Sequence, residues 1–327
     1  MGVDGGSSRY TDTANLQHYV MTWALLLEQT LNGFQLGVLL FLLAAGLTLV
    51  FGIMDLVNLA HGSLYMAGAF FCATFTDWTE SFLLGVLLAL PATLVLGIVV
   101  EIVTLRTLYA RDHLDQVLAT FGIILFFNEL TRIIWGPEGL VIPLPGWLDG
   151  NFEIMAGVFY PTFRILIITV GLAVALGLYL LVAKTRIGML IRAGASDRDM
   201  VGVLGVNVKM LFTLIFGLGA ALAGLAGMMA GPIIEVNIGM GEEILILAFV
   251  VIVIGGIGSI RGAFVAALIV GLIDTMGRSF LDLLLKTLIS GNAAETAAPA
   301  LSAMLVYILM ATVLFFRPQG LFAPRGG

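Results

Sequence analysis

The residue types best suited to chemistry gather in one polar stretch of an otherwise apolar sequence. Asp55, Asn58, His61, Ser63 and Tyr65 all fall within residues 55–65. In a helix, Asn58 and His61 are three residues apart and Tyr65 lies four beyond, so the three side chains share a face. Polar groups in apolar surroundings usually face a cavity or a partner. We therefore predict that Asn58, His61 and Tyr65 line a substrate pathway, and the alternative is a hydrogen-bonded network that only packs helices.

A second candidate site lies in the polar stretch at 185–210. Ser196, followed three residues later by Asp199, resembles a capping box that starts a helix. Gly205 can end that helix in a left-handed conformation. A short capped helix with exposed apolar and charged residues needs a partner surface, and the alternative is packing against neighbouring loops. The candidate partner-contacting residues are Ser196, Asp197, Arg198, Asp199, Met200, Val203 and Leu204.

Other kinds of chemistry find no support in the sequence. It has no G-x-x-x-x-G-K-[ST] phosphate loop and no Gly-Lys dipeptide, so we expect no ATP hydrolysis and no bound cofactor in this chain. Its three histidines (His18, His61 and His113) are far apart and lack the paired spacing of a metal site. We also find no nucleophile–base pair, so we predict neither catalytic residues nor a metal, and an intramembrane enzyme is disfavoured.

Composition decides the surroundings of these sites. The chain has 327 residues, of which 60% are hydrophobic and 11% charged, and its mean hydropathy is +1.09. Soluble domains have about 25% charged residues. A soluble core of this size could not bury so much apolar surface, so the solvent must be lipid. The net charge of −6 gives no footprint for nucleic acid.

The apolar segments predict an all-α, polytopic membrane protein with eight or nine transmembrane helices. Candidate spans are 31–50, 60–77, 82–105, 114–134, 162–184, 211–231, 243–257, 261–278 and 300–316. Two apolar stretches, 52–63 and 255–262, are interrupted by glycine and polar residues. Such breaks are typical of broken or re-entrant helices along a transport path, although ordinary tight turns would also fit.

The domain organisation follows from these spans. We predict an N-terminal tail with an interfacial helix at 1–30, containing Trp23, then a transmembrane domain at 31–317 and a C-terminal cytoplasmic tail at 318–327. Ten Lys and Arg residues fall in one set of loops and five in the other, which places the first set, the 185–210 loop and the C-terminus in the cytoplasm. The N-terminus and the acidic loops, including Glu242 and Glu243, are then expected outside.

Small and charged residues inside the spans predict how the helices pack. Gly219, Ala223, Gly227 and Gly231 recur every four residues, a spacing that lets helices approach closely in lipid. Glu129 and Arg132 are three residues apart and can form an ion pair. Asp274 lies near the end of another span, where it can reach a head group or a neighbouring side chain.

Several of these segments together resemble a known family. The stretch 46–68, which contains Asp55-Leu-Val-Asn-Leu-Ala-His-Gly62, resembles the signature of the branched-chain amino acid ABC permeases of the LivH type. Further matching motifs are Leu118–Gly122, Arg192–Val208, Gly255–Ala263 and Arg317–Phe322, so that the resemblance runs from about residue 30 to the end. Ser63 stands where many members of the family carry Glu.

The resemblance implies the permease subunit of an ABC importer for branched-chain or related amino acids in a bacterial inner membrane. Its partners would be a second homologous permease of the LivM type, two ATPase subunits that bind ATP and Mg, and a periplasmic substrate-binding protein. The helix at 196–204 would be the coupling helix that contacts an ATPase. The alternatives are a urea or small organic acid permease of the same family and, in another class, a gradient-driven secondary transporter or channel.

Overall fold

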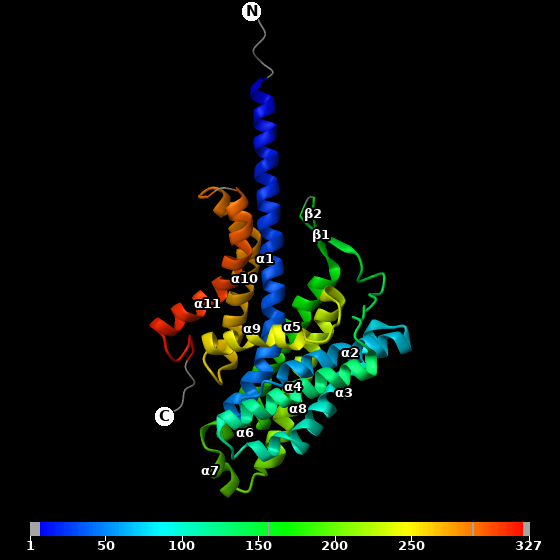
Figure 1. Ribbon diagram of the computed structural model, residues 1–327, viewed down its shortest axis with the longest axis vertical. Coiled ribbons are helices and arrows are strands. Elements are labelled where there is room, and N and C mark those ends of the chain that lie inside the picture. The colour runs from blue at the N-terminus through cyan, green and yellow to red at the C-terminus, as the bar shows by residue number, and fades with distance from the viewer. Residues whose placement is uncertain (1–6, 156, 290, 323–327) are drawn as a thin grey trace, which may run out of the picture.

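The computed structural model describes residues 7–155, 157–289 and 291–322 (Figure 1). Its helices are α1 (Ser7–Met54), α2 (His61–Thr79), α3 (Phe82–Val103), η1 (Leu105–Leu108), α4 (His113–Trp135), α5 (Thr162–Lys184), α6 (Arg186–Ser196), α7 (Arg198–Val203), α8 (Val208–Ile234), α9 (Met240–Gly255), α10 (Ile260–Lys286) and α11 (Gly291–Phe316). Two short antiparallel strands, β1 (Asn151–Met155) and β2 (Val158–Pro161), form a hairpin.

The predicted all-α, polytopic membrane fold is confirmed. Each of the nine candidate spans lies on a helix, and seven described helices are long and apolar enough to cross a membrane. The other two, α2 and α9, have 19 and 16 residues. About 20 apolar residues are needed to span the hydrocarbon core. Of the two, only α9 is shorter than the range of about 17–25 residues for a spanning helix, and both helices belong to the candidate site.

Helix α1 is a single long rod in the middle of the molecule (Figure 1). The interfacial helix expected before residue 30 is not a separate element, because α1 continues without a break from Ser7 to Met54. It ends where Asp55 adopts a positive φ of 52°. A non-glycine residue in this left-handed region stops the helical hydrogen-bond ladder and turns the chain.

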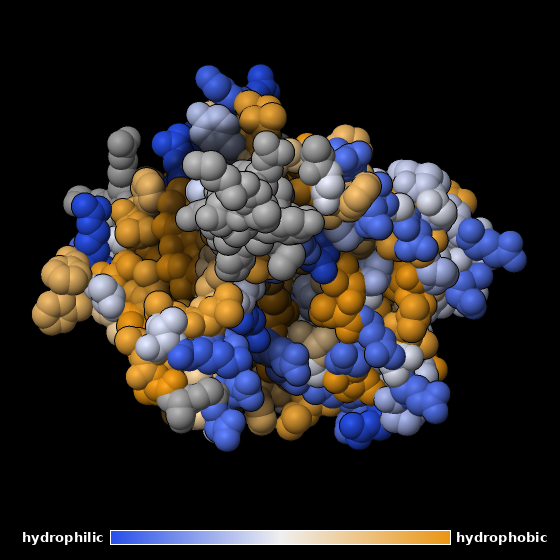
Figure 2. Space-filling model, turned by 90° about the horizontal axis from the view of Figure 1, so that it is seen from above, coloured by the Kyte–Doolittle hydropathy of each residue, from blue (hydrophilic) through white to orange (hydrophobic). Residues whose placement is uncertain are grey.

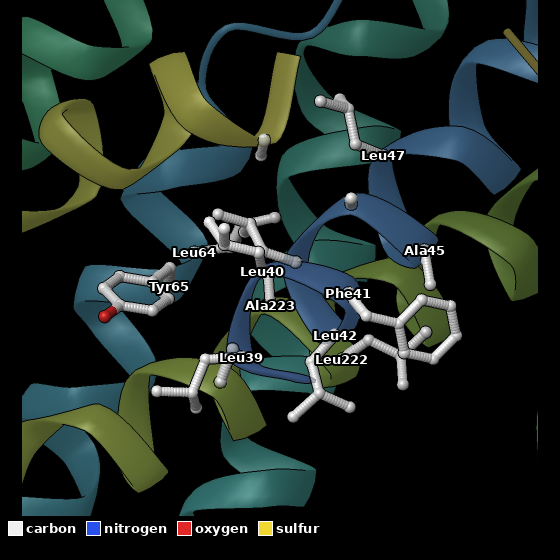
Figure 3. Close-up of a cluster of buried hydrophobic side chains, with 14 of the residues drawn as sticks. Leu39, Leu40, Phe41, Leu42, Ala45, Leu47, Leu64, Tyr65, Leu222 and Ala223 are labelled. Atoms are coloured by element: carbon white, nitrogen blue, oxygen red, sulfur yellow. The ribbon is translucent and has the colours of Figure 1, made fainter. Parts of the chain in front are cut away.

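The core is centred on α1, which packs against α8 and α10, while α8 also packs against α2 and α3. Leu40, Leu42 and Phe41 of α1 pack beside Leu222 and Ala223 of α8 (Figure 3). Glycines allow the backbones to touch: a Cβ on Gly46 would lie 2.7 Å from the carbonyl oxygen of Gly219. In lipid, this kind of close van der Waals packing holds helices together.

The remaining spans surround this core and expose apolar side chains. In α1 and α8, 83% and 72% of the most apolar window is buried, against 28% or less in α3, α4, α5 and α11. Seen from above, apolar side chains lie along much of the flank (Figure 2). Since exposed leucines and phenylalanines are stable against hydrocarbon, these peripheral faces suit contact with lipid or with another membrane subunit.

The two ends of the molecule differ in their connections. One end, which we call the α7 end, carries α6 and α7. Thr185 caps α6, because its Oγ1 accepts the N–H of Gly188 at 3.1 Å. The other, the hairpin end, carries β1 and β2, which the sequence did not predict. The segment before the hairpin folds back onto the core, since Leu140 forms a two-way backbone bridge with Val236.

Candidate functional site

A side chain from another helix hydrogen-bonds to the segment that connects α1 and α2. The N–H of Val57 donates to Oε1 of Gln116 at 3.1 Å. The amide nitrogen of Gln116 donates to the carbonyls of Leu108 and Arg111 at 3.3 and 3.2 Å. Gln116, which is buried on α4, therefore supplies the hydrogen bond that a broken helix leaves unmade.

Helix α2 begins beside the middle of α8. His61 is the first residue of α2, and a Cβ on Gly46 of α1 would lie 2.8 Å from its Nε2. The same Gly46 contacts Gly219, which is near the centre of α8. No side chain caps the N-terminus of α2. The chain thus turns at Asp55, runs back along α1, and starts α2 at a level inside the helical bundle.

The predicted pathway residues lie together around this start. Asn58 and His61 are both fully buried. The amide atoms of Asn58 have no hydrogen-bond partner in the described chain, whereas the ring of His61 lies within reach of the Leu43 backbone. Tyr65 is buried beside the leucine cluster with its hydroxyl turned away from it (Figure 3). Buried polar groups are normally hydrogen-bonded. The alternative prediction of a hydrogen-bonded packing network finds no such bond at Asn58 in the described chain, whereas the position of His61 beside the Leu43 backbone fits it.

Helix α9 begins at the same place from the other side. After α8 ends, the chain turns back at Glu235 (φ 62°), and Val236 lies against Gly231 of α8. Gly241, in the first turn of α9, meets Gly62 of α2 backbone to backbone, so closely that neither position has room for a Cβ. Two short helices therefore start at one crossing, which we call the α2–α9 crossing.

The first turn of α9 carries two carboxylates that sequence reasoning placed in an outer loop. The loop assignment is corrected by the structure, because α9 starts at Met240 and includes both Glu242 and Glu243. Negative side chains are favourable in a first turn, where they face the positive end of the helix dipole. Glu242 accepts a hydrogen bond from Nδ2 of Asn128 at 2.6 Å, whereas Glu243 is exposed.

Both interrupted stretches meet at the far end of α9. A Cβ on Gly52 would lie 2.7 Å from the Cα of Gly258, which links the α1 break to the second glycine-rich motif. The C-terminal motif joins them, since the N–H groups of Leu321 and Phe322 donate to the carbonyls of Ile254 and Gly255 at 2.8 and 3.1 Å. The C-terminal segment thus satisfies carbonyls that the end of α9 leaves free.

The predicted partner-contacting residues lie on α7 and at its junction with α6. The helix start differs from the prediction, since Ser196 is the last residue of α6 and the Asp197 carboxylate accepts the N–H of Met200 at 2.9 Å. Gly205, with φ 86°, follows the helix as predicted. Met200, Val203 and Leu204 are 56%, 83% and 76% exposed. The side chains of Arg198 and Asp199 lie outside the described part of the chain.

A hollow lies between the end of α6 and the α1 break. It is lined by Phe51, Gly52, Ile53, Asp55, Gly194, Ala195, Ser196 and Asp197. On its floor, a Cβ on Gly194 of α6 would be in ordinary contact with Ile53 at 3.6 Å. The end of α6 therefore rests directly on the last turn of α1.

The sequence reasoning missed a buried polar cluster at the α7 end. Glu101 is fully buried and accepts hydrogen bonds from Arg106 (3.2 and 3.0 Å), Tyr109 (2.6 Å) and Thr213 (2.8 Å). Burial, and after it the bond to Glu101, raise the pKa of the Tyr109 hydroxyl, which stays a donor. The available signal was an acidic residue in an apolar run with Arg106 five positions later, a spacing that helical pairing rules do not cover.

The other singled-out residues have structural surroundings. Glu129 and Arg132 form the predicted ion pair at 2.9 Å on an exposed face. Buried Asp274 pairs with Arg278 at 2.9 Å. In the four-residue repeat, Gly219 lies against α1, Gly227 against the Tyr65 carbonyl of α2 and Gly231 against Ile142, and Ala223 is buried. Among the described residues no group of three His, Cys, Asp or Glu could hold a metal ion.

Comparison with known proteins gives a consistent set of relatives. A family described as "Branched-chain amino acid transport system / permease component" matches residues 29–314. The chain is 32% identical to the high-affinity branched-chain amino acid transport permease BraD of Pseudomonas aeruginosa, over 90% of this chain and 95% of that one. It is 29% identical to LivH of Escherichia coli (90% and 96%) and 26% identical to the fructose import permease FruF of Bifidobacterium longum (82% and 72%). No solved structure matches.

Proposed function

Because the chain belongs to the family of branched-chain amino acid transport permeases, we propose that it is the membrane-spanning permease subunit of an ABC importer for branched-chain or related amino acids. The identities of 32% and 29% to two branched-chain amino acid permeases exceed the 26% to a fructose permease and support this substrate class. Urea and small organic acids remain the alternative substrates, and no contact in the structure favours them.

The exposed apolar face of α7 is the observation that supports the role of a subunit driven by a separate ATPase. Met200, Val203 and Leu204 have no covering element in the described chain. Three exposed apolar side chains on one capped turn are a typical anchor for a groove in a partner. We infer that α7 is the coupling helix and docks in an ATPase subunit, which binds the ATP and Mg that this chain does not.

The contacts behind α7 support a route for the motion. Asp197 joins α7 to α6, and the end of α6 rests on Ile53 in the last turn of α1. A shift of α7 would therefore press on the α1 break, next to Asn58 and His61. These two side chains and Tyr65 are proposed to line the pathway and to meet substrate in another state of the cycle, because ligands drive such changes only through differential contacts.

The proposed assembly follows the family resemblance. A second homologous permease of the LivM type, two ATPase subunits and a periplasmic binding protein would complete the importer. We place it in the bacterial inner membrane with the α7 end and the C-terminus in the cytoplasm and the hairpin end and the N-terminus outside. The excess of Lys and Arg in the loops of the α7 end supports this orientation.

The test uses the full complex with a double variant in α7. Met200→Asp with Leu204→Asp should leave membrane insertion intact, but reduce ATPase co-purification and ATP-dependent leucine uptake at least tenfold, because charges replace the docking face. Phe159→Asp, which changes an equally exposed apolar residue in the hairpin, is the control and should do neither. A gradient-driven transporter predicts instead that the isolated chain transports in liposomes without ATP and that the α7 variant behaves as wild type.

A further inference from the structure

Glu243 is an exposed carboxylate at the start of α9, and no described residue pairs with it. In the described chain no hydrogen bond or ion pair reaches it, and the Tyr65 hydroxyl is a group on which it acts electrostatically. Its neighbour Glu242 is different, since it is bonded to Asn128 at 2.6 Å. The two carboxylates of one turn therefore have separate roles, and only Glu242 has a structural one.

The position of Glu243 is inside the spans rather than at their ends. The backbone of Gly241 touches Gly62, and the neighbouring His61 lies against Gly46, which in turn contacts Gly219. Gly219 precedes the end of α8 at Ile234 by 15 residues, or about 22 Å of helix. An unpaired carboxylate at membrane depth is costly and usually marks a substrate or ion pathway.

Two buried polar residues precede the Gly62–Gly241 contact, which lies two residues before Glu243. Asn58 and His61 are fully buried, and the amide atoms of Asn58 lack partners within the described chain, whereas the His61 ring lies within reach of the Leu43 backbone. Both residues adjoin the N-terminus of α2, where no side chain of the described residues forms a cap and only the N–H of Ser63 already donates, to the Ala60 carbonyl at 3.0 Å. Free N–H groups and the positive end of the helix dipole favour an anion at such a terminus. The α2–α9 crossing thus offers a carboxylate on one side and hydrogen-bond donors on the other.

We propose that the α2–α9 crossing binds the charged head group of an α-amino acid, with Glu243 contacting the ammonium group and Asn58, His61 and the start of α2 contacting the carboxylate. This inference rests on the proposed import function and adds to it the part of the substrate that the permease recognises. Urea and sugars lack the ammonium–carboxylate pair and would make neither contact. A basic residue of the second permease is the competing partner for Glu243.

The test measures transport and ATPase activity of the complete importer in proteoliposomes, with leucine-loaded binding protein. Glu243→Gln keeps the side chain's shape and removes its charge. It should lower the maximal rate of leucine uptake at least tenfold, while stimulation of the ATPase stays within twofold of wild type. Asn58→Ala should show the same separation of uptake from ATPase activity. The matched control, Glu138→Gln in an exposed loop, should transport within twofold of wild type.

Two results would overturn the inference. One is leucine uptake by Glu243→Gln within twofold of wild type. The other is loss of the second permease from the purified Glu243→Gln complex, which would assign Glu243 to a subunit contact. Failure of the proposed function gives a different result, because the wild-type complex itself would then show no ATP-dependent leucine uptake.

Discussion

The α2–α9 crossing and the Glu101 cluster both bury polar side chains, but only in the Glu101 cluster do all of them have hydrogen-bond partners among the described residues. At Glu101, three side chains donate to one carboxylate, and both of its oxygens are used. At the crossing, Asn58 is equally buried, and its amide atoms have no partner in the part of the chain that the structure describes. A satisfied polar network stabilises a structure, whereas an unsatisfied one persists only when function requires it. The comparison separates a structural anchor from a candidate site.

Removing the carboxylate of the anchor should have the largest effect on stability. Glu101→Ala removes the acceptor of the Tyr109 hydroxyl, whereas Arg106 and Thr213 keep the Thr213 hydroxyl and the Lys209 carbonyl as acceptors. Leaving a buried donor unsatisfied costs about 1–3 kcal/mol. We expect a lower thermal unfolding temperature for the detergent-solubilised protein, measured by size-exclusion chromatography after heating. Glu101→Gln, which retains one acceptor oxygen, should lose less. An unchanged unfolding temperature in Glu101→Ala would remove the distinction between the two regions.

Filling the crossing should affect both stability and transport. Gly62→Ala places a methyl group against the Gly241 backbone, and overpacking of this kind costs about 1–3 kcal/mol. We expect loss of uptake and a reduced unfolding temperature. Gly122→Ala is the matched control, since a Cβ there meets nothing within 4 Å in the described chain. Equal behaviour of the two variants would show that the close approach of α2 and α9 has no role.

Replacing an unsatisfied polar side chain at the crossing should stabilise the protein rather than destabilise it. Asn58→Leu removes buried donors and acceptors that lack partners, and should raise the free energy of unfolding by about 1 kcal/mol. Leucine uptake should nevertheless fall at least tenfold. The unfolding temperature and the uptake rate are measured on the same preparation. A destabilised variant would mean that Asn58 makes hydrogen bonds to a partner that holds the fold together.

The smallest effect is expected at the exposed ion pair on α4. Glu129→Gln removes the charge that pairs with Arg132, and exposed pairs contribute about 0.2–1 kcal/mol. Uptake and unfolding temperature should both stay close to wild type. A large loss in either would show that this face of α4 is covered by another subunit.

The sequence predicted which segments are helical better than it predicted the level in the bundle at which each helix starts. Apolar runs located all nine candidate spans, because a membrane helix must be long and apolar. The same rule says nothing about the starts of α2 and α9 inside the bundle, which depend on glycine contacts between distant segments such as Gly62 with Gly241. At the α6–α7 junction the sequence did not identify the residue that caps α7. Ser196 and Asp197 can both cap a helix, and only the backbone geometry selects Asp197.

The candidate site was only partly predictable for the same reason. The polar types and spacing of Asn58, His61 and Tyr65 were visible in the sequence. Glu243 was counted with the acidic outer loops although it is also the first residue of the span predicted at 243–257, and nothing local indicates that the chain turns back along α8 after Ile234. The convergence of the two glycine-rich breaks with the C-terminal motif is also a property of the tertiary structure, since 52, 258 and 321 are distant in sequence.

Cysteine accessibility at position 58 tests most directly whether the α2–α9 crossing meets the substrate. The described chain holds one cysteine, buried Cys72, so Cys72→Ala with Asn58→Cys gives a single labelling site in this subunit. In the complete importer, we predict that a small polar thiol reagent labels Cys at position 58 only during ATP turnover, and that leucine-loaded binding protein slows the labelling. Absence of labelling in every nucleotide state would contradict the assignment and leave the crossing as a packing contact.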